Sequence, residues 1–202
     1  MEIATPRGLA RAEMVMPKGR GKPKALLALG HGAGGDVTSA DLVAVRDAAV
    51  AAGVAVALIT QPYRVAGRKA PAPAAQLDEA WQAVLSHLRA HSKVTAPVVT
   101  GGRSSGARVA CRTATAVGAA GVVALAFPLH PPGRPEKSRA DELTTGVPTL
   151  VVNGDRDPFG VPPKKRGIDL VVLAGERHDL RKDPSAVAGA VVDWLRSHGW
   201  AR

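Results

Sequence analysis

The chain has 202 residues, 46% of them hydrophobic, which argues against a disordered protein and predicts one folded core, expected as a single domain over residues 1–202. Its one cysteine, Cys111, excludes an intrachain disulfide framework and a cysteine-based zinc site, as expected in a reducing compartment. The formal net charge of +10 comes from 27 basic and 17 acidic residues, so nucleic-acid binding has to be weighed.

Basic residues are spread along the chain instead of being gathered into one segment. The sequence contains six aromatic residues (three Trp, two Phe and one Tyr), and none alternates with basic residues as a nucleic-acid stacking platform requires. We therefore predict no nucleic-acid partner and interpret the charge as a general surface property, compatible with anionic substrates. The basic residues concerned are Lys18, Arg20, Lys22, Lys24, Arg64, Arg68, Lys69, Lys164, Lys165 and Arg166.

The amino-terminal residues, MEIATPRG, lack the basic stretch and the following apolar stretch that define a secretory signal. No apolar run reaches the roughly 18 residues that a membrane-spanning helix needs. We therefore expect a cytoplasmic protein with no membrane partner. The sequence leaves open whether the protein is a monomer or a homodimer.

Six short apolar runs, rich in Ala, Val, Leu and Ile, predict buried strands. Continuous apolar runs of this length are typical of strands that are covered on both faces, so they predict a mostly parallel sheet. In chain order, the runs occupy residues 24–29, 54–59, 97–100, 122–127, 148–152 and 168–173.

Helical patterns lie between these runs. Thr38 followed by Asp41 resembles a capping box and predicts a helix from there through Ala52. Residues 61–74 are rich in Pro, Arg and Ala and are expected to form a loop. The clearest helix follows, with five apolar residues spaced so that they share one face: Leu77, Trp81, Val84, Leu85 and Leu88.

Further helices are expected over residues 104–117, over residues 137–143 and after Asp183, which should cap a last helix with Pro184 at its first position. Strands that alternate with helices predict an α/β fold, a three-layer αβα sandwich with a mostly parallel sheet of six to seven strands. The longest candidate insertions, residues 61–74 and 128–146, leave little room for a cap domain.

Gly102-Arg103-Ser104-Ser105-Gly106 matches the pattern G-x-S-x-G and lies between a predicted strand and a predicted helix. In that context the pattern is typical of a nucleophile elbow, whose glycines let strand and helix approach closely. The Ser104 hydroxyl would then lie at a helix N-terminus, where developing negative charge is stabilised. The alternative is a plain Gly/Ser turn, and the strand–turn–helix context favours the catalytic interpretation.

A serine nucleophile needs a general base, and His178 is the best candidate. It follows the last predicted strand and can therefore reach the carboxyl edge of the sheet. His87 and His91 flank the end of an amphipathic helix and are expected to face solvent, while His198 lies at a helix end and complements the helix dipole. The chain order Ser–Asp–His favours His178 further.

The acid is expected within residues 153–160 (NGDRDPFG), which directly follow a predicted strand. Asp155 and Asp157 are both candidates. We favour Asp157, because Pro158 stiffens the backbone just after it and Asp155 suits a turn. The chosen carboxylate should accept a hydrogen bond from Nδ1–H of His178 and so fix the tautomer of the imidazole.

The oxyanion hole is expected from two backbone N–H groups. One belongs to Ser105, directly after the nucleophile, and the other to the glycine-rich segment 31–35 (HGAGG), with Ala33 preferred and Gly34 second. Each such donor contributes about 3 kcal/mol to transition-state stabilisation. The segment could otherwise be an ordinary glycine-rich loop. A phosphate-binding loop is disfavoured, since neither G-x-G-x-x-G nor a Walker lysine pattern occurs.

Several segments together resemble the α/β-hydrolase superfamily and, more narrowly, its dienelactone-hydrolase-like KANL3/Tex30-like domains. They are GHGAGG, the Tyr63-Arg64 and Gly67-Arg68 stretch, GGRSSGARVA, FPLHPPGRPEK and NGDRDPFG, in that order over most of the chain. The family commonly has G-x-S-M-G-G at the elbow, whereas this chain has Ser105 and Ala107. Ser105 keeps its N–H, so the difference affects the shape of the pocket and leaves the oxyanion hole possible.

Together the motifs and the resemblance imply a carboxylesterase-like serine hydrolase, without cofactor or metal, that acts on a small acyl substrate through an acyl-enzyme. Thioesterase and peptidase activities are less favoured. His31 and His130 are candidate substrate contacts, although the prolines around His130 favour a rigid turn over a substrate contact. The alternative function is a non-catalytic protein-interaction module with the same fold.

Overall fold

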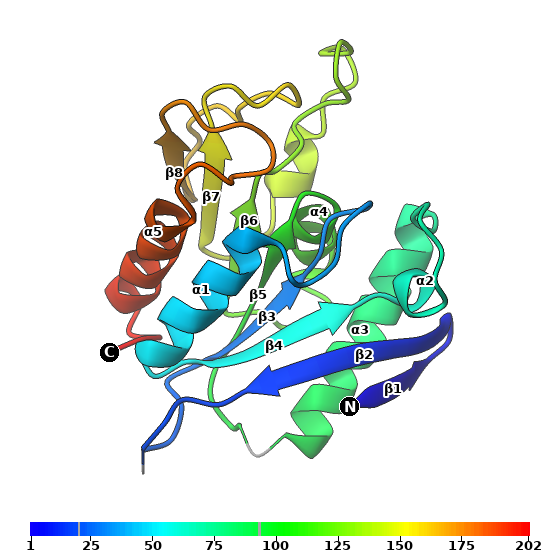
Figure 1. Cartoon of the computed structure of the whole chain (residues 1–202), viewed down its shortest axis with the longest axis vertical. Helices are drawn as coiled ribbons and strands as arrows, with labels where there is room; N and C mark the ends of the chain where they lie inside the picture. The colour runs from blue at the N-terminus through cyan, green and yellow to red at the C-terminus, as the bar shows by residue number, and fades with distance from the viewer. Residues whose placement is uncertain (20, 93) are drawn as a thin grey trace.

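The computed structural model describes residues 1–19, 21–92 and 94–202, so Arg20, one of the basic residues named above, lies outside the described residues. Within these residues, the centre is an eight-stranded sheet in the order β1-β2-β4-β3-β5-β6-β7-β8 (Figure 1). The strands are β1 (Glu2–Thr5), β2 (Gly8–Val15), β3 (Leu26–Gly30), β4 (Ala55–Thr60), β5 (Val98–Arg103), β6 (Gly121–Leu125), β7 (Thr149–Gly154) and β8 (Ile168–Leu173).

Strands β3 to β8 are parallel to one another and correspond to the six predicted runs. The expected number of six to seven strands was too low, because β1 and β2 extend the sheet with an antiparallel hairpin. Few residues of that hairpin are buried, namely Ile3, Ala10 and Ala12, and they alternate with exposed side chains. Such short and weakly apolar alternation gives little signal in the sequence.

Helices cover both faces of the sheet, which gives the predicted three layers (Figure 1). Alternate side chains of β3 serve the two cores: Leu27 and Leu29 pack on the side of α1 and α5, and Leu26 and Ala28 on the side of α3 and α4. The helices are α1 (Ala40–Ala51), α2 (Pro62–Val65), α3 (Ala74–His91), α4 (Ser105–Thr113) and α5 (Pro184–Ser197), with a 3₁₀ helix at Ala140–Leu143.

Two predicted helix starts have different outcomes. Asp183 caps α5 as predicted, because its carboxylate accepts a hydrogen bond from the N–H of Ala186 at 2.9 Å. The predicted capping box at α1 is wrong. Ser39 is the N-cap residue and makes no side-chain capping bond, while the hydroxyl and N–H of Thr38 bond to Asp36. Asp41 is instead fully buried and takes part in an ion pair described below.

The remaining helices follow the predictions in part. All five residues predicted to share one face of α3 are buried. The helix predicted over residues 104–117 ends at Thr113, and the predicted loop 61–74 contains the short helix α2. Residues 155–167 connect β7 to β8 without a helix. Because α5 packs on only one face of β8, the other face is partly open, and Val172 is 45% exposed.

Candidate active site

Ser104 occupies the turn between β5 and α4, at the carboxyl edge of the sheet. Its backbone has φ 53° and ψ −109°, a conformation that residues with a side chain rarely adopt, and it bends the chain sharply from strand into helix. The flanking glycines make this approach possible, since a Cβ atom at Gly102 or Gly106 would overlap the carbonyl oxygen of Gly30 in β3. The turn has the geometry expected of a nucleophile elbow.

The imidazole of His178 lies between Ser104 and Asp157 and contacts both. Its Nε2 is 2.9 Å from the Oγ of Ser104, and its Nδ1 is 2.8 Å from the Oδ2 of Asp157. With the proton on Nδ1, the ring donates to the carboxylate and accepts from the serine hydroxyl, which is the arrangement that a general base requires. The structure thus connects three side chains from three separate loops by consecutive hydrogen bonds.

Asp157 is held in place by neighbours within its own turn. Its carboxylate is fully buried, and Oδ1 accepts a hydrogen bond from the N–H of Phe159 at 2.8 Å. The side-chain amide of Asn153, at the end of β7, donates to Oδ2 at 3.3 Å. The competing candidate, Asp155, points elsewhere and accepts the N–H of Gly175 at 2.7 Å. It stabilises the turn and does not contact the imidazole of His178.

Asn153 was not singled out from the sequence, although it begins the NGDRDPFG segment. It is completely buried, and its Oδ1 accepts the N–H of Phe127 at 2.9 Å. Its amide also lies 3.2 Å from the carbonyl oxygen of Phe127 and 3.3 Å from that of Gly160. Asn153 therefore joins the end of β6 to the turn that carries Asp157.

The glycine-rich segment after β3 lies beside the elbow. A Cβ atom at Gly32 would be 3.7 Å from the Cβ of Ser104, and the carbonyl of Ala33 is held by the hydroxyl of Tyr63 at 2.8 Å. Among the hydrogen bonds of the described residues, none is donated by the backbone N–H of Ala33, Gly34 or Ser105. These N–H groups remain available for an oxyanion, as their proposed role requires.

The structure does not support direct substrate binding by His31. The side chain is 2% exposed, its Nδ1 lies 2.8 Å from the carbonyl oxygen of Gly32, and its Nε2 accepts the N–H of Gln61 at 3.1 Å. Burial lowers the pKa of His31, which keeps the ring neutral. Because both ring nitrogens are used, His31 links the start of the glycine-rich segment to Gln61 and offers no ring nitrogen to a substrate.

His130 lies close to the site but contacts backbone. Its Nδ1 is 2.9 Å from the carbonyl oxygen of Pro131, and its N–H donates to the carbonyl of Phe159 at 3.0 Å. The ring fills the space beside Gly160, where a Cβ atom would be 2.5 Å from Nε2. These contacts fit the rigid-turn interpretation and place His130 against the loop that carries Asp157.

Cys111 is not a competing nucleophile. It is buried in α4, and burial raises the pKa of its thiol to about 12. Nucleophilic attack by cysteine requires the thiolate, which is scarce at neutral pH when the pKa is that high.

Comparison with known proteins agrees with this geometry. Residues 23–183 match the family described as "Alpha/beta hydrolase domain". The chain belongs to the α/β-hydrolase family. The matched residues run from just before β3 to the residue that caps α5, so they include the elbow, the glycine-rich segment and the His178 loop. No curated protein matches the sequence.

Solved structures with the same α/β-hydrolase fold include XC6422 from Xanthomonas campestris, described as an α/β serine hydrolase without a lid. It is 19% identical, with a TM-score of 0.82 over 98% of this chain and 93% of that one. Est1E from Butyrivibrio proteoclasticus, solved with ferulic acid, is 19% identical, with a TM-score of 0.81 over 98% of each chain. Dienelactone hydrolase from Anabaena variabilis is 18% identical, with a TM-score of 0.78 over 100% and 97%. These similarities show that the α/β-hydrolase fold extends over nearly the whole chain.

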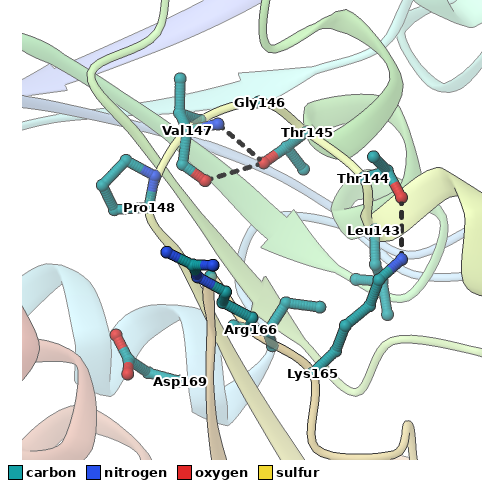
Figure 2. A pocket seen from close by; sticks show the side chains of 11 residues that line it. Leu143, Thr144, Thr145, Gly146, Val147, Pro148, Lys165, Arg166 and Asp169 are labelled. Atoms are coloured by element: carbon teal, nitrogen blue, oxygen red, sulfur yellow. Dashed lines mark hydrogen bonds between the residues drawn. The ribbon is translucent and has the colours of Figure 1, made fainter.

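One surface pocket lies away from Ser104. A surface pocket of about 450 Å³, shown in Figure 2, is formed at the amino ends of β7 and β8, whereas the elbow lies at the opposite edge of the sheet. Lys165 and Thr144 are hydrogen-bonded across it at 3.2 Å. Among the described residues, no group of three or more His, Cys, Asp or Glu side chains is arranged to hold a metal ion. No described helix is both long and apolar enough to cross a membrane.

Proposed function

We propose that this α/β-hydrolase is a carboxylesterase-like serine hydrolase that cleaves small ester-type acyl substrates with Ser104 as nucleophile, His178 as general base and Asp157 as the carboxylate that orients His178. The observation that carries the proposal is the unbroken row of hydrogen bonds, 2.9 and 2.8 Å long, from Ser104 through His178 to a buried carboxylate. A row of this kind at a strained elbow activates a hydroxyl that is otherwise a poor nucleophile.

In the acylation step, Oγ of Ser104 forms a bond to the substrate carbonyl carbon while its proton passes to Nε2 of His178. The carbonyl π electrons move to the oxygen, and the N–H groups of Ser105 and Ala33, with Gly34 as the second choice, would stabilise that oxyanion. Asp157 holds Nδ1–H and stabilises the imidazolium. When the tetrahedral intermediate collapses, the imidazolium gives its proton to the leaving alcohol and the acyl-enzyme remains.

Deacylation reverses the roles. Water enters where the alcohol left, and Nε2 of His178 takes one of its protons as the oxygen attacks the acyl carbon. Collapse of the second intermediate breaks the bond to Oγ, which recovers its proton from the imidazolium, and releases the carboxylic acid. The imidazole side chain of His178 is 18% exposed, so water can reach the ring without any movement of a lid.

Two features support small esters as substrates. The fold has no lid, and the cavity that contacts Ser105 has a volume of only about 10 Å³, room for about one water molecule, so a long acyl chain would not be enclosed there. Among the similar structures is a dienelactone hydrolase, named for a cyclic ester, which favours esters over thioesters and peptides. We further propose membership of the KANL3/Tex30-like group, on the segments quoted above.

The proposal is tested by hydrolysis of p-nitrophenyl acetate and butyrate. Ser104→Ala and His178→Ala should each lower kcat at least about 10³-fold, and Asp157→Ala somewhat less. Asp155→Ala is the matched control, since this carboxylate lies in the same turn but, among the described residues, is hydrogen-bonded only to Gly175. It should keep kcat within a few-fold of the wild type. Circular dichroism should show that all four variants are folded.

A fluorophosphonate probe gives an independent measurement, because it labels an activated serine without requiring turnover. Mass spectrometry should locate the label on Ser104 in the wild type and find none in Ser104→Ala. A folded wild type that neither hydrolyses the esters nor reacts with the probe would overturn the proposal. That result would favour the alternative, a non-catalytic α/β-hydrolase fold that binds a protein partner.

A further inference from the structure

Arg103, the residue directly before the nucleophile, reaches three segments outside its own strand. Its side chain is 16% exposed, and its Nε lies 3.1 Å from the Oδ2 of Asp41 in the first turn of α1. Its Nη2 donates to the carbonyl oxygen of His178 at 3.1 Å. Its Nη1 packs against Gly32, where a Cβ atom would be 3.0 Å away. One guanidinium therefore contacts the residue that carries the base and the glycine-rich segment beside Ser104.

Asp41 is an unusual partner, because its carboxylate is completely buried. Burial raises the pKa of Asp41, and the positive charge of Arg103 opposes that effect. Among the described residues, neither carboxylate oxygen nor the Nε of Arg103 has a well-aligned hydrogen-bond partner, so the pair is a charge contact. A buried ion pair contributes little net stability compared with apolar side chains of similar size, so stability alone is a weak reason for its presence.

The hydrogen bond from Arg103 to the carbonyl oxygen of His178 suggests that the pair holds the loop that carries the imidazole. His178 is carried by the loop between β8 and α5, and it is 74 residues from Ser104 in the sequence. The bond from Arg103 fixes the main chain of His178 to the end of β5, the strand that directly precedes Ser104. A planar guanidinium directs several N–H groups outward at once, which a lysine ammonium on a flexible chain cannot reproduce.

We propose that Arg103 and Asp41 act as a positioning pair, in which Asp41 holds the guanidinium so that it sets the main chain of His178 within hydrogen-bond reach of Ser104. This inference rests on the proposed function. Arg103 does not touch the reacting atoms, so its effect would be on the chemical step through the placement of the imidazole. Substrate binding should be little affected, because neither side chain of the pair takes part in the proposed oxyanion hole or in the Ser104–His178–Asp157 row.

The test compares Arg103→Lys and Asp41→Asn with Arg112→Lys. Arg112 is a matched control: it is 19% exposed and paired with Asp78 at 2.6 Å and Glu142 at 3.2 Å, in a network that has no contact with His178. Arg103→Lys and Asp41→Asn should each lower kcat about 10- to 100-fold and change KM less than about threefold. Arg112→Lys should lower stability without changing kcat. The double variant should be no slower than the slower single variant, because the two residues act as one unit.

A second measurement does not depend on turnover. The imidazole ¹⁵N signals of His178, assigned with His178→Ala, should shift in Arg103→Lys and Asp41→Asn and remain unchanged in Arg112→Lys. If the wild type hydrolyses no ester, the proposed function fails and these signals alone decide the inference. Folded variants with wild-type kcat and wild-type His178 signals would overturn it. Failure of both variants to fold would also overturn it, since the pair would then serve the scaffold.

Discussion

The ring of Phe159 is stacked on the imidazole of His178, with ring centroids 4.1 Å apart and an angle of 29° between the planes. The same residue donates its backbone N–H to the carboxylate of Asp157 at 2.8 Å. Phe159 thus contacts two of the three proposed catalytic residues through different groups. Its side chain restricts rotation of the imidazole, and its backbone orients the carboxylate that fixes the tautomer.

Replacing Phe159 separates these contributions. Phe159→Ala removes the stacked ring but keeps the N–H, so kcat for p-nitrophenyl acetate should fall about 10-fold with only a small effect on folding. Phe159→Tyr keeps the stacked ring and should retain most of the wild-type rate. Steady-state kinetics on both variants is the measurement. Equal rates for Phe159→Ala and the wild type would show that the stacking has no part in orienting His178.

Replacement of Asn153 should lower the stability of the protein. Asn153→Ala leaves the buried N–H of Phe127 without its acceptor and the carboxylate of Asp157 without one of its donors. We expect the free energy of unfolding to fall by about 2–4 kcal/mol, in the range for a broken buried hydrogen-bond network. Urea unfolding measures this directly, with Asp155→Ala as a variant of the same turn. A change below about 1 kcal/mol would contradict the role assigned to Asn153.

The two glycines Gly106 and Gly189 should respond in opposite ways to alanine. A Cβ atom at Gly106 would overlap the backbone of Gly30, so Gly106→Ala must push α4 away from β3 and should lower stability by at least about 2 kcal/mol. Gly189 lies in α5 with nothing within 4 Å of a Cβ atom. Gly189→Ala should therefore raise stability by about 0.5–1 kcal/mol. Thermal unfolding of Gly106→Ala and Gly189→Ala is the measurement. If both substitutions change the stability by a similar amount, the close approach of α4 and β3 at the elbow is refuted.

The buried His31 makes stability depend on pH. Since burial lowers its pKa in the folded protein, the unfolded chain binds a proton that the folded chain does not. This part of the stability is present above the ordinary histidine pKa of about 6.5 and is lost as the pH falls from there through the lower, folded value. His31→Asn cannot titrate. Its free energy of unfolding should be lower at pH 7.5 but should decline less steeply towards pH 5. Urea unfolding at several pH values measures this. If the free energies of unfolding of the wild type and His31→Asn fall in parallel between pH 7.5 and pH 5, the effect is excluded.

How much of the fold could be predicted depends on how local the signal is. Strands β3 to β8 are continuous apolar runs, so a window of a few residues identifies each of them. The β1–β2 hairpin buries only Ile3, Ala10 and Ala12, between exposed residues such as Arg11. Its place in the sheet is determined by pairing with β4, which no local pattern contains.

The candidate site also contains residues with a local sequence signal and residues without one. Ser104, Asp157 and His178 could be selected because an elbow pattern and a chain order single them out, and their catalytic roles remain the proposal made above. Arg103 and Asn153 could not be selected, because their importance lies in what their side chains reach. Arg103 bonds to a residue 75 positions away, and Asn153 to one 26 positions away. Contacts at such separations appear only when the chain is folded.

The left-handed backbone of Ser104 has a consequence for laboratory evolution. Only glycine adopts φ 53° without penalty, so Ser104→Gly should relax the turn and make the protein about 1 kcal/mol more stable while removing the proposed nucleophile. Selection for heat resistance alone would therefore enrich Ser104→Gly, which the proposed mechanism makes inactive. A library built on this scaffold needs a turnover screen in every round, because at position 104 stability favours glycine whereas the proposed activity requires serine.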